Sequence, residues 1–293
     1  MSDHPAQAVT MIGLELPDVD LWSERVVVAL GQNPGLFTGP GTNTYLVGTG
    51  PERILLDTGQ GRPEYLPVLE QALARVNCGI QEIVLTHGHV DHIRGVEGIR
   101  ERHGPLRVSK FPWPEFDRAC PVEMAPLADG DVVECEGATL RALHTPGHAA
   151  DHLCFMLEEE NSVFSGDNVL GVGTTVIPAE GGDLQEYMAS LEKLLGESPN
   201  RIYPAHGPCI ADGVSKLQEY IAHREQREQE ILAALADGRH TIPEIVSLVY
   251  AAYPESLHPA ARMSVCSHLL KLRREGRVES RGENALDARW HLR

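Results

Sequence analysis

A run of seven residues, Thr86-His87-Gly88-His89-Val90-Asp91-His92, brings three imidazoles and one carboxylate together within six positions. It follows the apolar stretch Glu82-Ile83-Val84-Leu85, which predicts a buried strand. A tight turn at the end of that strand can hold these side chains around one or two metal ions. Neutral imidazole and carboxylate suit zinc, which leaves a position open for an attacking water. The run therefore favours a fold whose metal-binding residues lie on loops at the ends of strands.

Three more candidate ligands follow along the chain, each at the end of a predicted strand. Strand 140–143 leads to Thr145-Pro146-Gly147-His148, strand 162–165 to Gly166-Asp167, and strand 201–203 to Pro204-Ala205-His206-Gly207. Loops beyond strand ends are where α/β proteins build their sites, so we expect His148, Asp167 and His206 to join the histidine run. Asp57 ends an earlier strand, where its carboxylate is placed to orient one of the ligands.

The acidic composition constrains the partners of the chain. Its 293 residues carry a formal net charge of −17, which repels long polyanions. No apolar run approaches the roughly 20 residues that a membrane span needs, so we expect no membrane contact. Met1 to Asp20 contain no Lys or Arg, which argues against a secretory signal and an Arg-rich transit peptide. We therefore expect a cytoplasmic protein.

Hydrophobic periodicity and turn residues predict many strands and few helices before residue 213. The predicted strands cover residues 24–30, 43–48, 53–57, 82–86, 131–134, 139–143, 152–157, 162–165 and 201–203. The predicted helices cover residues 63–76, 91–103 and 183–195, the last with Asp183 as its N-cap. This order predicts an α/β fold in which helices cover two packed sheets, an αβ/βα sandwich.

The character of the chain changes near residue 214, so we predict a catalytic domain over 1–213 and a second domain over 214–293. Helices near 214–236, 242–250 and 259–274 and a hairpin from 277 to 291 indicate a winged-helix arrangement. The third helix ends in the basic residues Lys271, Arg273, Arg274 and Arg277. We interpret them as a solvated helix end, where cations are favoured; a lid over the substrate cleft or a homodimer contact are the alternatives.

The ordered set of motifs between residues 43 and 208 resembles the metallo-β-lactamase superfamily. This resemblance implies a binuclear site that holds two Zn2+ ions. One zinc would be bound by His87, His89 and His148. The other would be bound by Asp91, His92 and His206, with Asp167 bridging the two. A glutamate in place of His89 would indicate the diiron members, so this histidine favours zinc.

The mechanism that we expect from such a site is hydrolysis. Two divalent ions about 3.5–4 Å apart generate a bound hydroxide near neutral pH and stabilise the oxyanion that forms. Asp91 and Asp167 are the candidate catalytic residues, because either carboxylate could receive the proton of the attacking water.

A closer resemblance narrows the family and leaves the substrate open. Residues 30–35, 41–48 and 166–171 are similar to those of the β-lactamase-like protein 2 family, which also carries a C-terminal winged-helix-like domain. That family includes an endoribonuclease, so the resemblance implies single-stranded RNA as substrate. Similar sequences release acyl groups from carrier proteins, which makes a carrier-bound or small-molecule ester or thioester the alternative.

Two other classes of function remain as hypotheses. A single-iron persulfide-type dioxygenase of the same superfamily needs only one metal site, and the complete second ligand set argues against it. A DNA-binding regulator would need the basic helix end to contact duplex DNA. Because the ligand set is complete, we assign His144 and His152 to supporting or core positions. We expect the remaining histidines at the surface, namely His103, His223, His240, His258, His268 and His291.

Overall fold

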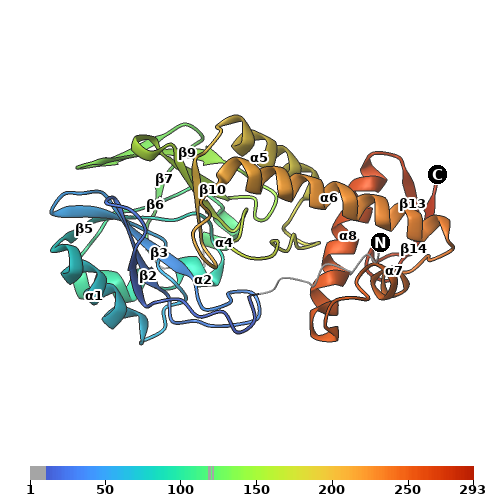
Figure 1. Ribbon diagram of the computed structural model, residues 1–293, viewed down its shortest axis with the longest axis horizontal. Helices are drawn as coiled ribbons and strands as arrows, with labels where there is room; N and C mark the ends of the chain where they lie inside the picture. The colour runs from blue at the N-terminus through green and yellow to red at the C-terminus, as the bar shows by residue number, and fades with distance from the viewer. Residues whose placement is uncertain (1–10, 118–119, 121) are drawn as a thin grey trace, which may run out of the picture.

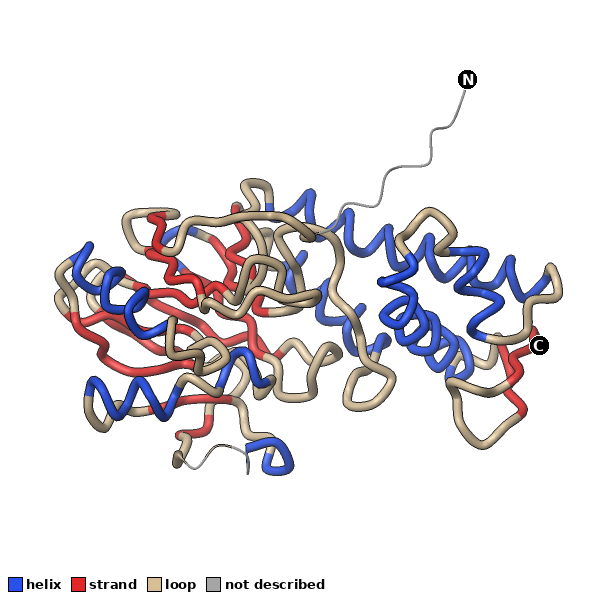
Figure 2. The backbone as a smooth tube through the Cα atoms, turned by 90° about the horizontal axis from the view of Figure 1, so that it is seen from below, coloured by secondary structure: helices blue, strands red, loops and turns tan. Residues whose placement is uncertain are grey.

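Two β-sheets pack face to face and carry helices on their outer surfaces, as Figures 1 and 2 show. The computed structural model describes residues 11–117, 120 and 122–293. The described chain thus has the predicted αβ/βα sandwich, followed by a smaller helical part that ends in a two-stranded ribbon.

Over the described residues, the first sheet contains seven strands in the order of the chain. They are β1 (Val19–Leu21), β2 (Val26–Leu30), β3 (Asn43–Val47), β4 (Glu52–Leu56), β5 (Gly79–Val84), β6 (Val108–Lys110) and β7 (Ala125–Pro126). Strands β1 to β4 pair antiparallel, whereas β4 to β7 pair parallel. The parallel pairing places the carboxyl ends of β4 and β5 at the same edge, where Asp57 and the histidine run follow.

The second sheet has five strands in the part of the chain that is described, in the order β12-β11-β10-β9-β8. They are β8 (Val132–Cys135), β9 (Ala138–His144), β10 (Leu153–Leu157), β11 (Ser162–Gly166) and β12 (Arg201–Pro204). β10 is antiparallel to both β9 and β11, and β11 is parallel to β12. Strands β9, β11 and β12 therefore run in one direction and end at one edge of the sheet.

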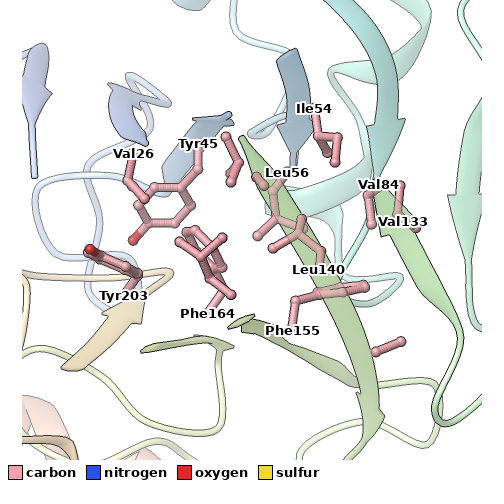
Figure 3. Close-up of a cluster of buried hydrophobic side chains, with 14 of the residues drawn as sticks. Val26, Tyr45, Ile54, Leu56, Val84, Val133, Leu140, Phe155, Phe164 and Tyr203 are labelled. Atoms are coloured by element: carbon pink, nitrogen blue, oxygen red, sulfur yellow. The ribbon is translucent and has the colours of Figure 1, made fainter. Parts of the chain in front are cut away.

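The core between the sheets consists of inward-facing side chains from both (Figure 3). Tyr45 of β3 meets Phe164 of β11 edge to face, with ring centroids 4.9 Å apart. Val84 and Leu56 of the first sheet and Leu140 and Phe155 of the second complete this layer. Burial of so many apolar groups holds the two strand edges, and the loops beyond them, in a fixed relation.

Helices cover the outer face of each sheet. The outer face of the first sheet packs against α1 (Tyr65–Val76) and α3 (Val96–His103), and that of the second against α5 (Leu184–Gly196) and the start of α6 (Gly213–Ala236). The predicted N-cap is confirmed, because the Asp183 carboxylate accepts from the backbone amides of Gln185 and Glu186. Shorter elements are α2 (Val90–Ile93), α4 (Pro114–Asp117) and the 3-10 turns Glu158–Glu160 and Glu255–Leu257.

The single helix predicted over 91–103 is wrong, because α2 and α3 are separate helices. The His92 carbonyl accepts from the backbone amide and the hydroxyl of Thr58, at 2.9 and 2.6 Å, so it leaves the helical pattern. Gly95 follows the break at a close backbone approach, where a Cβ atom would lie 1.9 Å from the Thr58 carbonyl oxygen. The break seats the His92 ring inside the protein.

The C-terminal part is built from α6, α7 (Ile242–Val249), α8 (His258–Arg274) and a hairpin of β13 (Val278–Arg281) and β14 (Arg289–Leu292). Its core surrounds the fully buried Trp290. Figure 1 shows α6 running from the sandwich into this part. Its Leu217 packs in the outer layer of the second sheet and its Ile231 in the C-terminal core. The domain boundary at residue 213 stays a prediction.

One histidine contradicts the surface prediction. His268 of α8 is 1% exposed, and within the described part of the chain neither of its ring nitrogens has a hydrogen-bond partner. Burial first, and then the nearby cations Arg224 and Lys271, hold the pKa of His268 well below its usual value. The ring is therefore neutral and belongs to the junction of α6 and α8.

Candidate metal centre

The histidine run forms the turn between β5 and α2, at the carboxyl edge of the first sheet. His89 adopts an extended backbone conformation and forms the N-cap position of α2, so the backbone changes from extended to helical within the motif. His87 lies before this change and is fully buried. Asp91 and His92 lie after it, in the short helix. The turn thus separates the four candidate ligands into two pairs.

The other three predicted residues reach the same point from the second sheet. His148 lies in the loop after β9, Asp167 directly after β11, and His206 two residues beyond β12. The structure brings all seven predicted residues together in two groups, and within each group the candidate ligand atoms lie within 4.8 Å of one another. The first group contains His87, His89, His148 and Asp167, and the second contains Asp91, His92 and His206.

In the first group, three imidazole nitrogens converge. His89 Nδ1 lies 2.9 Å from His87 Nε2 and 3.0 Å from His148 Nε2. Asp167 Oδ2 lies 3.4 Å from His148 Nε2. Three nitrogens and one carboxylate oxygen at these separations form a donor set of the kind that zinc accepts.

In the second group, carboxylate oxygens face two imidazoles. His206 Nε2 lies 3.3 Å from Asp91 Oδ2 and 3.2 Å from Asp167 Oδ1. His92 Nε2 lies 3.3 Å from the same oxygen of Asp167. Asp167 therefore directs Oδ2 at the first group and Oδ1 at the second, which is the geometry of a bridging carboxylate.

Hydrogen bonds on the far side of the rings fix which nitrogen faces the centre. His148 Nδ1 donates to the Val176 carbonyl at 3.0 Å, and His206 Nδ1 donates to the Gly41 carbonyl at 3.4 Å. A carbonyl oxygen only accepts, so each ring carries its proton on Nδ1 and, when neutral, directs the lone pair of Nε2 inward. This is the tautomer that a metal ligand needs.

Asp57 is hydrogen-bonded to the third ring, that of His92. Its Oδ2 accepts from His92 Nδ1 at 2.8 Å, and both of its oxygens accept from Thr86, one from the amide and one from the hydroxyl, at 2.8 Å. Asp57 has a φ of 60°, which is rare for a non-glycine residue. This strained backbone conformation turns the carboxylate from the end of β4 toward His92.

The electrostatics of the two groups differ. Burial lowers the pKa of His148 to about 4, so this ring is neutral at pH 7. Burial also opposes the charged form of His206, but the carboxylates of Asp167 and Asp91 outweigh it and raise the pKa to about 9. The buried atoms His92 Nε2 and Asp167 Oδ1 have no hydrogen-bond partner among the described residues. The oxygen-rich second group therefore attracts positive charge, and its donor set suits a divalent cation.

Other polar side chains support the centre without joining it. The backbone amide of Asp167 donates to His152 Nε2 at 3.1 Å. His144 stacks on Phe111, with ring centroids 4.1 Å apart. Sequence reasoning missed Thr42, whose hydroxyl donates to Asp91 Oδ2 at 3.3 Å. It also missed Val176, because a backbone carbonyl leaves no signature in the residue type.

Comparison with known proteins places this fold and site in a class. The profile of the metallo-beta-lactamase superfamily matches residues 37–206, and that of the beta-lactamase associated winged helix domain matches residues 241–290. The chain belongs to the metallo-β-lactamase superfamily, and it is one of the hydrolytic enzymes of that superfamily. The predicted fold, a sandwich with a C-terminal winged-helix domain, is thereby confirmed.

Relatives with similar sequences cover most of the chain. A beta-lactamase-like protein 2 homolog from Drosophila melanogaster is 40% identical over 275 residues, which span 90% of this chain and 92% of that protein. An atrochrysone carboxyl ACP thioesterase from Claviceps purpurea is 41% identical over 254 residues, which span 85% and 78%. The predicted resemblance to the β-lactamase-like protein 2 family is confirmed.

Solved structures agree with this assignment. A metallo-beta-lactamase family protein from Thermus thermophilus superposes with a TM-score of 0.76 at 27% identity and covers 93% of this chain and 100% of its own. A second structure, of a protein in a di-iron-bound form, has a TM-score of 0.50 at 32% identity and covers 62% of this chain and 94% of its own.

None of the helices in the described part of the chain has the length and apolar character that a membrane span requires.

Proposed function

We propose that the chain is a binuclear zinc hydrolase that cleaves acyl thioesters. In this proposal His87, His89 and His148 hold one ion, Asp91, His92 and His206 hold the other, and Asp167 bridges them. The observation that carries the proposal is the position of Asp167, which directs one oxygen at each group. When bound, the two ions would supply a nucleophile derived from water and stabilise negative charge on the substrate.

The residues of the chain have separate tasks in this mechanism. Three oxygen atoms accept from the outer ring nitrogens of the histidines: the Asp57 carboxylate from His92, the Val176 carbonyl from His148 and the Gly41 carbonyl from His206. When these histidines act as ligands, the inward nitrogen of each ring is therefore unprotonated. The Asp91 side chain is 16% exposed, so water reaches it. Its Oδ2 is held by the Thr42 hydroxyl, and this carboxylate is placed to receive the proton that the attacking water loses.

Exposed apolar side chains on the loop before Thr42 and within the histidine run support an acyl substrate. Leu36 and Phe37 are 48% and 58% exposed on the loop that leads into Gly41 and Thr42. Val90, between two candidate ligands, is 47% exposed. These side chains can contact an apolar acyl group, whereas a net charge of −17 opposes a long polyanion. The thioesterase from Claviceps purpurea also supports this choice.

Single-stranded RNA is the second candidate substrate, because the resemblance to the β-lactamase-like protein 2 family implies it. The chain is 40% identical to a homolog of that family along nearly its whole length. A phosphodiester and a thioester are open to the same nucleophile. A cytoplasmic location and a homodimer likewise remain proposals.

One experiment separates these substrates. Purified protein loaded with zinc is given a panel of acyl thioesters, including carrier-bound ones, and labelled single-stranded RNA, each with and without a chelator. We expect thioester hydrolysis that stops on chelation and returns with added zinc. Cleavage of RNA with intact thioesters would instead establish the second candidate. One iron per chain together with oxygen consumption would contradict zinc hydrolysis altogether.

Replacing Asp57 with asparagine should weaken metal binding by roughly 10- to 100-fold, as loss of an outer hydrogen-bond partner does. The amide is uncharged and has one acceptor oxygen where the carboxylate has two, so the His92 ring loses its charged partner. Titration with zinc against a chelating dye measures the change. The control is Asp237→Asn, which alters an exposed carboxylate at the end of α6. Equal affinity in the two variants would show that Asp57 does not orient the ligand.

A further inference from the structure

The segment from Gly173 to Ala179, here called the backing segment, lies directly behind one candidate ligand. His148 Nδ1 donates to the Val176 carbonyl at 3.0 Å and lies 3.3 Å from the Thr175 hydroxyl. Thr175 and Ile177 on either side are 4% and 1% exposed. The orientation of the His148 ring therefore depends on where the backbone of this segment is held.

The C-terminal helices hold the segment by its carbonyl oxygens. Arg224 of α6 donates to the Thr175 carbonyl at 2.5 Å. The hydroxyl of Ser267 in α8 lies 2.7 Å from the Ile177 carbonyl, closer than to the Met263 carbonyl in its own helix at 3.0 Å. The two bonds flank Val176, so the carbonyl that orients His148 is fixed from both sides.

Packing reinforces these two hydrogen bonds. Ala179, at the end of the backing segment, packs against the core of the C-terminal part. Arg224 and Ser267 are both buried, and the Arg224 guanidinium lies over the Tyr187 ring, 5.2 Å from its centroid. The hydroxyl of Tyr220, also in α6, donates to the Gly173 carbonyl at 2.8 Å. The bonds that Arg224 and Ser267 donate to the segment are buried, and a hydrogen bond in such surroundings is stronger than one exposed to water.

Ion pairs join α8 to its neighbours at the same junction. Lys271 and Arg277 each donate to Glu228 of α6 at 2.6 Å, and Arg274 pairs with Asp183 at the start of α5. Part of the basic cluster that we interpreted as a solvated helix end thus fixes α8 against α5 and α6. The two donors to the backing segment are consequently placed by the C-terminal fold.

We propose that Arg224 and Ser267 are positioning residues for the metal centre, through which the C-terminal helices hold the ligand His148 in place. This inference rests on the proposed function, because it takes His148 as a ligand. It gives the C-terminal part a role in metal binding that is independent of any substrate. Loss of either donor frees the Val176 carbonyl and lets the His148 ring rotate away from the first group.

The test compares Ser267→Ala with Ser247→Ala in the full chain. Both hydroxyls lie near the carbonyl four residues earlier, at 3.0 Å for Ser267 and 2.9 Å for Ser247, but only Ser267 also reaches the backing segment. We expect Ser267→Ala to weaken binding of one of two zinc ions by roughly 10-fold, the lower end for an outer partner. Binding of the other ion should stay unchanged. The absorption spectrum of the cobalt-loaded protein should shift, and amides of the backing segment should exchange faster without metal.

The arginine gives a second, independent pair of variants. Arg224→Met should weaken binding of the same zinc ion. Arg224→Lys retains a donor, so its affinity for that ion should be close to that of the wild type. If Ser267→Ala does not fold, this pair of variants tests the proposal. Unchanged affinities and spectra in Ser267→Ala would overturn the proposal. Equal weakening of both ions with a lowered urea midpoint would also overturn it, as a global effect. Wild-type metal content and thioester hydrolysis test the proposed function separately.

Discussion

Replacing Asp167 with asparagine should lower the rate of hydrolysis by about 10³-fold or more, because it removes a charge that both halves of the centre share. Oδ1 faces His92 and His206, and Oδ2 faces His148. A neutral amide offers only one acceptor oxygen, so one group loses its carboxylate donor. The fold should persist, since the Asp167 backbone amide still donates to His152.

Metal content and kinetics together check this expectation. Zinc per chain should fall from two toward one in Asp167→Asn, measured by elemental analysis, while the circular dichroism spectrum and the urea midpoint stay close to those of the wild type. Asp237→Asn serves as the control, since that carboxylate is 71% exposed. Full activity in Asp167→Asn after verified loss of metal would contradict the bridging role.

The metal residues could be predicted from the sequence because each follows a strand. The end of a buried strand can be located in the sequence because its apolar run, such as Ile83-Val84-Leu85, stops there. The strands that precede His148, Asp167 and His206 all run toward one edge of the second sheet. The histidine and aspartate residues that follow these strands can then be identified as candidate metal ligands. The strand order within each sheet was not needed, since a sandwich that buries these strands brings their loops together.

The parts that could not be predicted depend on backbone atoms and on distant packing. The break between α2 and α3 arises because Thr58, which follows another strand, donates to the His92 carbonyl and takes it out of the helical pattern. The burial of His268 follows from the docking of α8 on α6, which the pattern of α8 does not encode. Strands β6 and β7 are absent from the predicted set because prolines around and within them, among them Pro105, Pro112 and Pro126, favour loops.

A buried ion pair joins the first sheet to the loop that carries His148, and breaking it should cost a large part of the stability. Lys110, the last residue of β6, donates to Asp151 Oδ2 at 2.5 Å and to the Phe111 carbonyl at 2.7 Å. Both charged residues are 1% exposed. Lys110→Met leaves the Asp151 carboxylate buried without its partner, and such losses cost about 3–5 kcal/mol.

Urea unfolding of a small set of variants measures this cost and isolates its cause. Lys110→Met should lower the free energy of unfolding by that amount, while the double variant Lys110→Met with Asp151→Leu should recover a good part. The fully buried carboxylate is then gone, and Asp117, whose carboxylate also lies 2.8 Å from the Lys110 ammonium, is 22% exposed. The exposed pair of Arg102 and Glu70 provides the control, because its N–O distance of 2.8 Å is similar but Arg102 is 63% exposed. Arg102→Met should cost less than about 1 kcal/mol. A Lys110→Met variant as stable as Arg102→Met would show that water reaches the Asp151 carboxylate and that the loop is held by other contacts.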